Sequence, residues 1–152
     1  MTTHIMSMTY GPKIEGVRNG TIRQTIRKYN PKRPFKLGDK LLIHGWSGKP
    51  YGSPWSWRME SVVTELDHLW MDNMVWVLKD HYDLTHEGYA SSMHVWDRPH
   101  PHIEKIAKDD GIVPPTPMEL LKVLEDFHGK FPRSGLLIYG DPPMAEFQVI
   151  RW

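Results

Sequence analysis

Residues 19–27 read NGTIRQTIR, a turn signal followed by a segment with the residue types of a β-strand. Side chains alternate between the two faces of a strand. One face of the predicted strand therefore carries Thr21, Arg23, Thr25 and Arg27, and the other carries Ile22, Gln24 and Ile26. The first face is cationic and bears hydroxyl groups, so it is the first candidate for a functional surface.

Turn residues divide the chain on both sides of this strand into short elements. Further strands are predicted at 5–10, 40–44, 57–66, 74–78 and 145–152, and helices at 13–18 and 103–109. A third helix is predicted between Thr116, a capping residue with Glu119 three positions later, and Gly129. Residues 79–98 have no clear pattern. This order favours an α+β fold, a small and partly open β-barrel with flanking helices.

The composition sets limits on the class of protein. A chain of 152 residues fits a single domain over 1–152, and the absence of cysteine excludes disulfides, thiolate nucleophiles and cysteine zinc sites. No apolar run approaches the roughly 18 to 20 residues of a membrane span, and the chain begins without a basic and apolar leader. We therefore expect a cytoplasmic protein with no membrane partner.

Positive charge is concentrated in one segment, although the formal net charge is only +1. Between Val17 and Lys40 the single acid is Asp39, against eight lysines and arginines. Basic segments with aromatic residues nearby are typical of surfaces that contact phosphates. The alternative is a solvated basic face, since lysine and arginine are normally exposed.

The loop 45–55 follows this basic segment and the strand 40–44, and it contains Trp46, Lys49 and Trp55. Aromatic rings stack on unpaired bases, and a lysine can bind a phosphate, so the segment from His44 to Tyr51 is a candidate recognition loop. The alternative is that the tryptophans pack beneath the loop. Arg58 projects into the same cleft or forms a surface ion pair with Glu60 or Glu65.

The residues above resemble the ASCH family of the PUA-like fold. The resemblance rests on 20–27, the Gly38-Asp39 turn entering 40–43, the segment 103–111, the helix 118–127 and the closing strand 147–152. It implies a PUA-like β-barrel with flanking helices and a cleft between them, related to modules that bind RNA. Some bacterial members are amidohydrolases that remove the acyl group from N4-acetylcytidine with a lysine, a threonine and an acid, and at least one is described as a ribonuclease.

Carried over by position, Thr25 matches the family's threonine and Asp110 its acid, whereas Ile22 stands where the family has its lysine. An isoleucine cannot transfer a proton, and Arg23 stays protonated. The other candidate bases are Asp110 itself, and Lys28, Lys36, Lys49 and His44 if loops bring them near. The sequence therefore favours binding over catalysis.

The first hypothesis is a binding module for RNA or a modified nucleoside. In it, Arg23, Arg27 and Lys28 contact phosphates, Trp46 stacks and Thr25 hydrogen-bonds a base edge, with His44, Lys49 and Arg58 lining the same cleft. The alternatives are an amidohydrolase that uses Thr25 and Asp110, and a ribonuclease. We expect no cofactor, and we expect no metal at His94, His100 and His102, whose neighbouring prolines make the segment extended.

Overall fold

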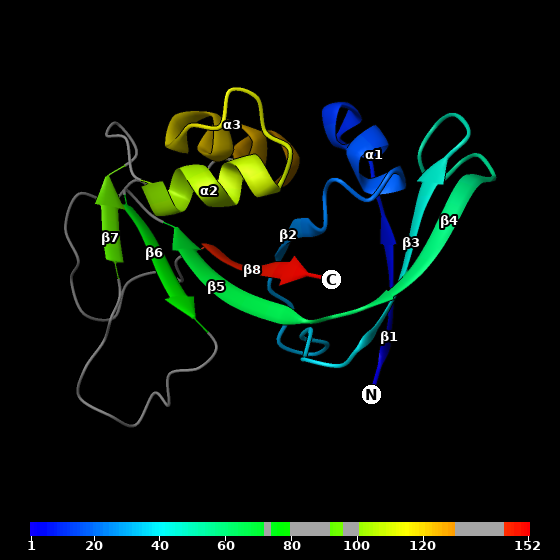
Figure 1. The fold of residues 1–152 in the computed structure, drawn as a ribbon, viewed down its shortest axis with the longest axis horizontal. Coiled ribbons are helices and arrows are strands. Elements are labelled where there is room, and N and C mark those ends of the chain that lie inside the picture. Colours follow the sequence, from blue (N-terminus) through cyan, green and yellow to red (C-terminus); the bar gives the residue numbers. More distant parts are fainter. Residues whose placement is uncertain (72–73, 80–91, 96–100, 130–144) are drawn as a thin grey trace.

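The computed structural model describes residues 1–71, 74–79, 92–95, 101–129 and 145–152, and its strands form two sheets (Figure 1). The first sheet has the order β1 (Thr3–Ser7), β3 (Lys40–Trp46), β4 (Trp55–Val62). The second has the order β2 (Gln24–Lys28), β8 (Ala145–Arg151), β5 (Glu65–Met71), β6 (Met74–Lys79), β7 (Ser92–Val95). β1 pairs with β3 in parallel, and all other pairs are antiparallel.

The two sheets meet where β4 passes into β5. The N–H of Val63 donates to the carbonyl of Asp39, the residue before β3 of the first sheet, while the next N–H, of Thr64, donates to the carbonyl of Arg151 in β8 of the second. The predicted single strand 57–66 is therefore two strands, each paired with different neighbours. The α+β class is confirmed, whereas the predicted partly open barrel is only loosely matched, because the described strands form two sheets that do not close into a barrel.

Three helices complete the described fold: α1 (Gly11–Arg18), α2 (Pro101–Asp109) and α3 (Pro117–His128). In Figure 1, α1 lies beside the first sheet, and α2 and α3 lie together over the second. The predicted cap of α3 is confirmed, because the Thr116 hydroxyl accepts the N–H of Glu119 at 3.2 Å. Gly129 then ends the helix with a φ of 84°.

The predicted strand 21–27 begins later than expected, at Gln24. Gly20 has a φ of 78°, the side chain of Asn19 accepts the N–H of Thr21, and the N–H of Ile22 donates to the carbonyl of Gly16. These contacts hold residues 19–22 against the end of α1, so Arg23 lies outside the strand. Thr25 and Arg27 remain within it.

β8 and Trp152, the residue that follows it, contribute to two hydrophobic clusters. Phe147 and Val149 pack with residues of α2 and α3, whereas Ile150 and Trp152 pack with α1 and the first sheet. The closing strand therefore joins both halves of the core.

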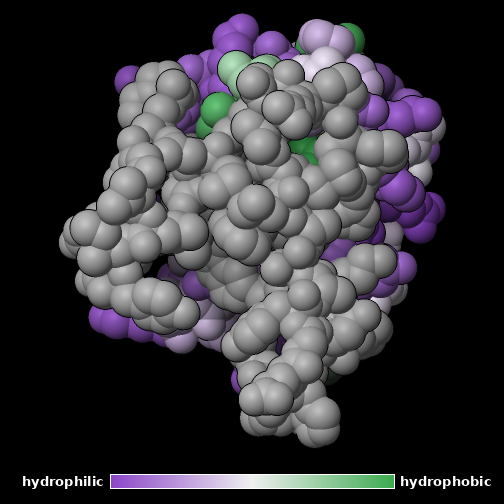
Figure 2. All heavy atoms as spheres, turned by 90° about the vertical axis from the view of Figure 1, so that its left-hand side faces the viewer, coloured by the Kyte–Doolittle hydropathy of each residue, from purple (hydrophilic) through white to green (hydrophobic). Residues whose placement is uncertain are grey.

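Figure 2 views the left-hand face of Figure 1, where the described residues visible at the margin are mostly hydrophilic. Within the described ranges, no helix has the length and apolar character to cross a membrane.

Candidate functional site

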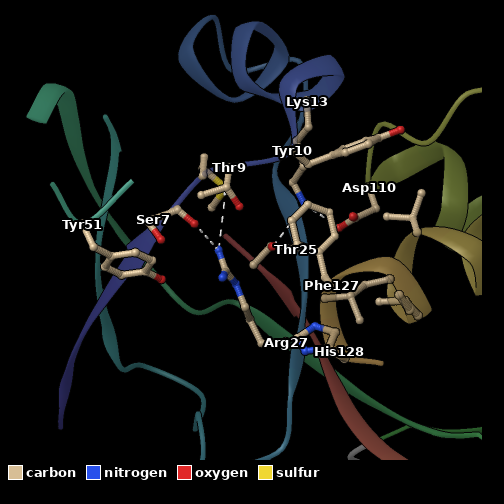
Figure 3. Close-up of a pocket in the computed structure, with 14 residues that line it drawn as sticks. Ser7, Thr9, Tyr10, Lys13, Thr25, Arg27, Tyr51, Asp110, Phe127 and His128 are labelled. Atoms are coloured by element: carbon tan, nitrogen blue, oxygen red, sulfur yellow. Dashed lines mark hydrogen bonds and ion pairs between the residues drawn. The ribbon is translucent and has the colours of Figure 1, made fainter. Parts of the chain in front are cut away.

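A buried lysine that the sequence analysis did not select lies at the centre of the candidate site. Lys13 is 4% exposed and lies one helical turn before Val17, so α1 carries both side chains on its buried face. The Lys13 ammonium donates to the Thr25 hydroxyl at 3.0 Å and to a carboxylate oxygen of Asp110 at 2.7 Å (Figure 3). Lysine, threonine and acid are thus assembled in one cluster, which we call the Lys13 cluster.

Thr25 is positioned by the pairing of β2. It is opposite Ile150 of β8, and the preceding residue, Gln24, donates its side-chain amide to the carbonyl of Ile106 in α2 at 2.8 Å. Gln24 also accepts a hydrogen bond from Arg151 at 3.0 Å. β2 is therefore fixed to β8 and α2 immediately beside Thr25. The Thr25 side chain is 2% exposed and faces Lys13.

Asp110 is positioned by the end of α2. Its N–H donates to the carbonyl of Ile106, and Gly111 follows with a φ of 76°, so the chain turns sharply after the carboxylate. A Cβ on Gly111 would lie 2.5 Å from Cδ1 of Ile22 and 3.5 Å from Cβ of Lys13. The side chain of Ile22 therefore packs where this glycine gives it room, beside the stem of Lys13.

Burial controls the charge of the cluster. Burial lowers the pKa of Lys13 from its ordinary value of 10.5, the positive charge of Arg27 lowers it further, and the carboxylate of Asp110 opposes both effects. Burial likewise raises the pKa of Asp110, while Lys13 and Arg27 oppose the rise. A lysine whose pKa is lowered in this way can act as a general base.

The Lys13 cluster opens into a pocket of about 230 Å³, which we call the inner pocket. Figure 3 shows Arg27 extending through it towards β1, where its guanidinium donates to the carbonyl of Ser7 at 2.6 Å. Tyr10, Phe127 and His128 supply aromatic walls, and the rings of Tyr10 and Phe127 meet edge to face at 6.3 Å. The inner pocket thus combines a buried hydroxyl, a buried lysine–carboxylate pair, an arginine and aromatic surfaces.

A second cavity of about 500 Å³, the outer groove, shares Ser7, Arg27 and Tyr51 with the inner pocket. Three further residues predicted to bind a ligand line it: Lys28, His44 and Trp46. His44 is buried, and burial lowers its pKa. The structure therefore distributes the predicted site over two connected cavities, with Arg27 common to both.

Three predicted ligand-binding residues line neither cavity. Arg23 is exposed and donates to the carbonyl of Gly20 at 3.2 Å. Lys49 is exposed in the loop between β3 and β4, and Arg58 is exposed on β4 opposite His44. The side chains of His94, His100 and His102 lie outside the described residues, and no cluster of three metal-binding side chains occurs among the described ones.

No protein-family model, no curated protein and no solved structure matches the chain.

Proposed function

We propose that this protein is an ASCH-type amidohydrolase of the PUA-like fold that removes an acyl group from the exocyclic nitrogen of a nucleobase. The observation that carries the proposal is the Lys13 cluster: a buried lysine 3.0 Å from a threonine hydroxyl and 2.7 Å from a carboxylate. Lys13 provides the amine that Ile22 lacks. The amine therefore comes from α1 and not from the turn before β2. The resemblance to the family supplies the substrate class.

In the proposed reaction the Thr25 oxygen attacks the carbonyl carbon of the amide. Lys13 in its neutral form accepts the hydroxyl proton as the bond forms, and then gives that proton to the departing amine. The acyl group remains as an ester on Thr25. Water, activated by Lys13 in the same way, hydrolyses the ester and restores the threonine, so the cycle consumes one water and needs no cofactor.

The neighbouring charges have separate roles in this scheme. Asp110 holds the ammonium form of Lys13 in place through the 2.7 Å ion pair. Arg27 places a fixed positive charge in the same pocket, where it favours the negative charge that develops on the carbonyl oxygen. At about 230 Å³ the inner pocket lies below the roughly 300 to 1,000 Å³ of sites for drug-sized ligands, so its size suits a single base.

The test is incubation of the purified protein with N4-acetylcytidine, followed by chromatography for cytidine and acetate in equal amounts. Lys13→Met is expected to abolish product formation. The matched control is Lys122→Ala, which removes an exposed lysine of α3. Absence of turnover with abundant folded protein, across a series of acylated nucleosides, contradicts the proposal.

A second candidate is a binding module for RNA or a modified nucleoside that has no catalytic activity. It is favoured by the outer groove, where Arg27, Lys28 and Trp46 lie together. Binding of a nucleoside or RNA that is unaffected by Lys13→Met, with no product from any substrate, would support this candidate. Cleavage of unmodified RNA that Thr25→Val abolishes would instead indicate a ribonuclease.

A further inference from the structure

The outer groove lies between the edges of the two sheets. β1 is an edge strand of the first sheet, and four consecutive residues of it, 4–7, line one wall. β2 is an edge strand of the second sheet, and its end and the following loop supply Arg27, Lys28 and Arg33 to the other wall. The groove thus continues from the inner pocket along two strand edges.

The charge of this groove has a single sign. Arg27, Lys28 and Arg33 line it, and none of the described lining residues is an aspartate or glutamate. Lys28 and Arg33 are exposed, and a guanidinium nitrogen of Arg33 donates to the carbonyl of Thr3 across the groove at 2.5 Å. Cations held at a concave surface without acids attract anions.

Two buried donors of the groove lack an acceptor. The Nε atom of Arg27 and the Nε1 atom of Trp46 are buried, and neither has a hydrogen-bond partner among the residues that the structure describes. Leaving a buried donor without an acceptor is unfavourable, and most buried polar groups in proteins have a hydrogen-bond partner. A ligand with several acceptor oxygens matches this requirement.

The junction between the two cavities is occupied by a strained aromatic residue. Tyr51 has a φ of 61°, the left-handed region that bulky side chains rarely adopt, and it is 83% exposed. Its ring lies 5.3 Å from that of Trp46, and beyond them Trp55 stacks on His44 at 4.0 Å. The loop therefore presents aromatic faces beside the cations, which is the combination that binds single-stranded nucleic acid.

We infer that the outer groove binds the phosphate of the nucleotide whose base enters the inner pocket, so that the preferred substrate is a nucleotide or a nucleotide strand and not the free nucleoside. This inference rests on the proposed function. The groove faces the inner pocket through Arg27 and Tyr51, which places an anion site next to a base site. Phosphate oxygens supply the acceptors that the groove lacks, and the aromatic loop stacks a neighbouring base.

The test compares three substrates at low salt: N4-acetylcytidine, its 5′-monophosphate, and a short single-stranded RNA with one internal N4-acetylcytidine. We expect kcat/KM for the phosphorylated substrates to exceed that of the nucleoside about tenfold or more, and the advantage to fall with added salt. Lys28→Ala/Arg33→Ala should reduce this ratio about tenfold. Lys32→Ala/Lys36→Ala, which removes two exposed lysines outside the groove, is the matched control.

The two phosphorylated substrates separate the sources of the anion. An advantage shared by both indicates a mononucleotide site, whereas an advantage confined to the strand indicates a nucleic-acid groove; either supports the inference. Equal kcat/KM for all three substrates overturns it, as does a strand advantage that Lys28→Ala/Arg33→Ala leaves intact. An acidic peptide that competes as well as RNA also overturns it.

Binding of fluorescently labelled RNA, followed by anisotropy, separates this inference from the proposed function. If no substrate is hydrolysed but RNA binding weakens about tenfold in Lys28→Ala/Arg33→Ala, the groove assignment stands and the amidohydrolase proposal fails. If the nucleoside is hydrolysed and RNA neither binds nor reacts faster, the amidohydrolase proposal stands and the groove assignment fails.

Discussion

Lys13 and Asp110 lie 97 positions apart in the chain, and their charged groups meet at 2.7 Å inside the protein. Their side chains are 5% and 9% exposed, so the pair is almost completely removed from water. An ion pair of this kind is weak evidence for a stabilising role, because desolvation offsets its attraction. Buried charged groups with shifted pKa values are common at functional sites, where a base needs a pKa suited to its reaction.

The stability of variants at these two positions should show this cost. Lys13→Met leaves a buried carboxylate without its cation, and we expect it to lower the free energy of unfolding by about 3 kcal/mol. Lys13→Met/Asp110→Leu removes both charges. We expect its free energy of unfolding to be at most about 1 kcal/mol below that of the unmodified protein, or higher than it. Urea denaturation of the unmodified protein, Lys13→Met, Asp110→Leu and the double variant gives the coupling energy between the two charges. Additive losses in the double variant would argue against a coupled buried pair.

Substitutions at Thr25 distinguish a nucleophile from a packing residue. Thr25→Val keeps the shape but has no hydroxyl, so we expect kcat on N4-acetylcytidine to fall by about 10³-fold or more. Thr25→Ser keeps the oxygen and should retain activity within about tenfold of the unmodified protein. Steady-state kinetics and intact-protein mass spectrometry for an acylated intermediate are the measurements. Equal activity of the valine and serine variants would remove Thr25 from the reaction.

The pH dependence of the rate should follow Lys13. The reaction needs its neutral amine, so kcat/KM should rise with pH, with a midpoint below 10.5 because burial lowers the pKa of Lys13. Asp110 beside it raises this pKa and Arg27 lowers it, while Tyr10, whose own pKa is raised by burial, and His128 line the same pocket. The observed midpoint belongs to the coupled pair.

Asp110→Asn provides the control for this assignment. It removes the carboxylate that favours the charged amine, so the rising limb should move to lower pH, whatever happens to the maximal rate. Lys122→Ala should leave the midpoint unchanged, since that lysine is exposed on α3. A midpoint that does not move in Asp110→Asn would show that another group controls the profile.

Features that depend on neighbouring residues were predictable from the sequence. The Thr116 cap, the left-handed Gly20 and the common face of Thr25 and Arg27 each follow from a few adjacent positions. The division of 57–66 into β4 and β5 was not predictable. It depends on Asp39 and Arg151, which are distant in sequence and accept the hydrogen bonds of consecutive N–H groups.

The contacts of Lys13 with Thr25 and Asp110 were not predictable either, for a similar reason. Its partners are 12 and 97 positions away, and the resemblance implies a lysine at position 22 and none at position 13. One local signal was present: Lys13 lies four residues before Val17, on the face of the helix that is buried. A lysine on an apolar face is unusual, since lysine is rarely buried without a partner. The helical spacing of Lys13 and Val17 indicates the face, but only the fold identifies the partners.

Moving the lysine tests whether the position of its amine, and not its place in the sequence, matters. Ile22 packs against Gly16 and Gly111, next to the stem of Lys13. Lys13→Ala should be inactive and should open space at this point. Lys13→Ala/Ile22→Lys brings an amine into the same space from the turn before β2. We expect this double variant to be at least about tenfold more active than Lys13→Ala, since a positioned base contributes about 10²–10⁴-fold.

The matched control is Lys13→Ala/Ile14→Lys, which places a lysine on α1 at a partly buried residue that packs against the same cluster of the core as Ile22. It should remain as inactive as Lys13→Ala, because adjacent side chains of a helix point about 100° apart and only position 13 is seen to reach Thr25. Thermal unfolding of each variant verifies that the protein is folded. Recovery of activity in both double variants would mean that an amine restores activity at either position, so that its exact placement does not matter. Recovery in neither, with folded protein, would show that the amine must be held on α1 by Asp110.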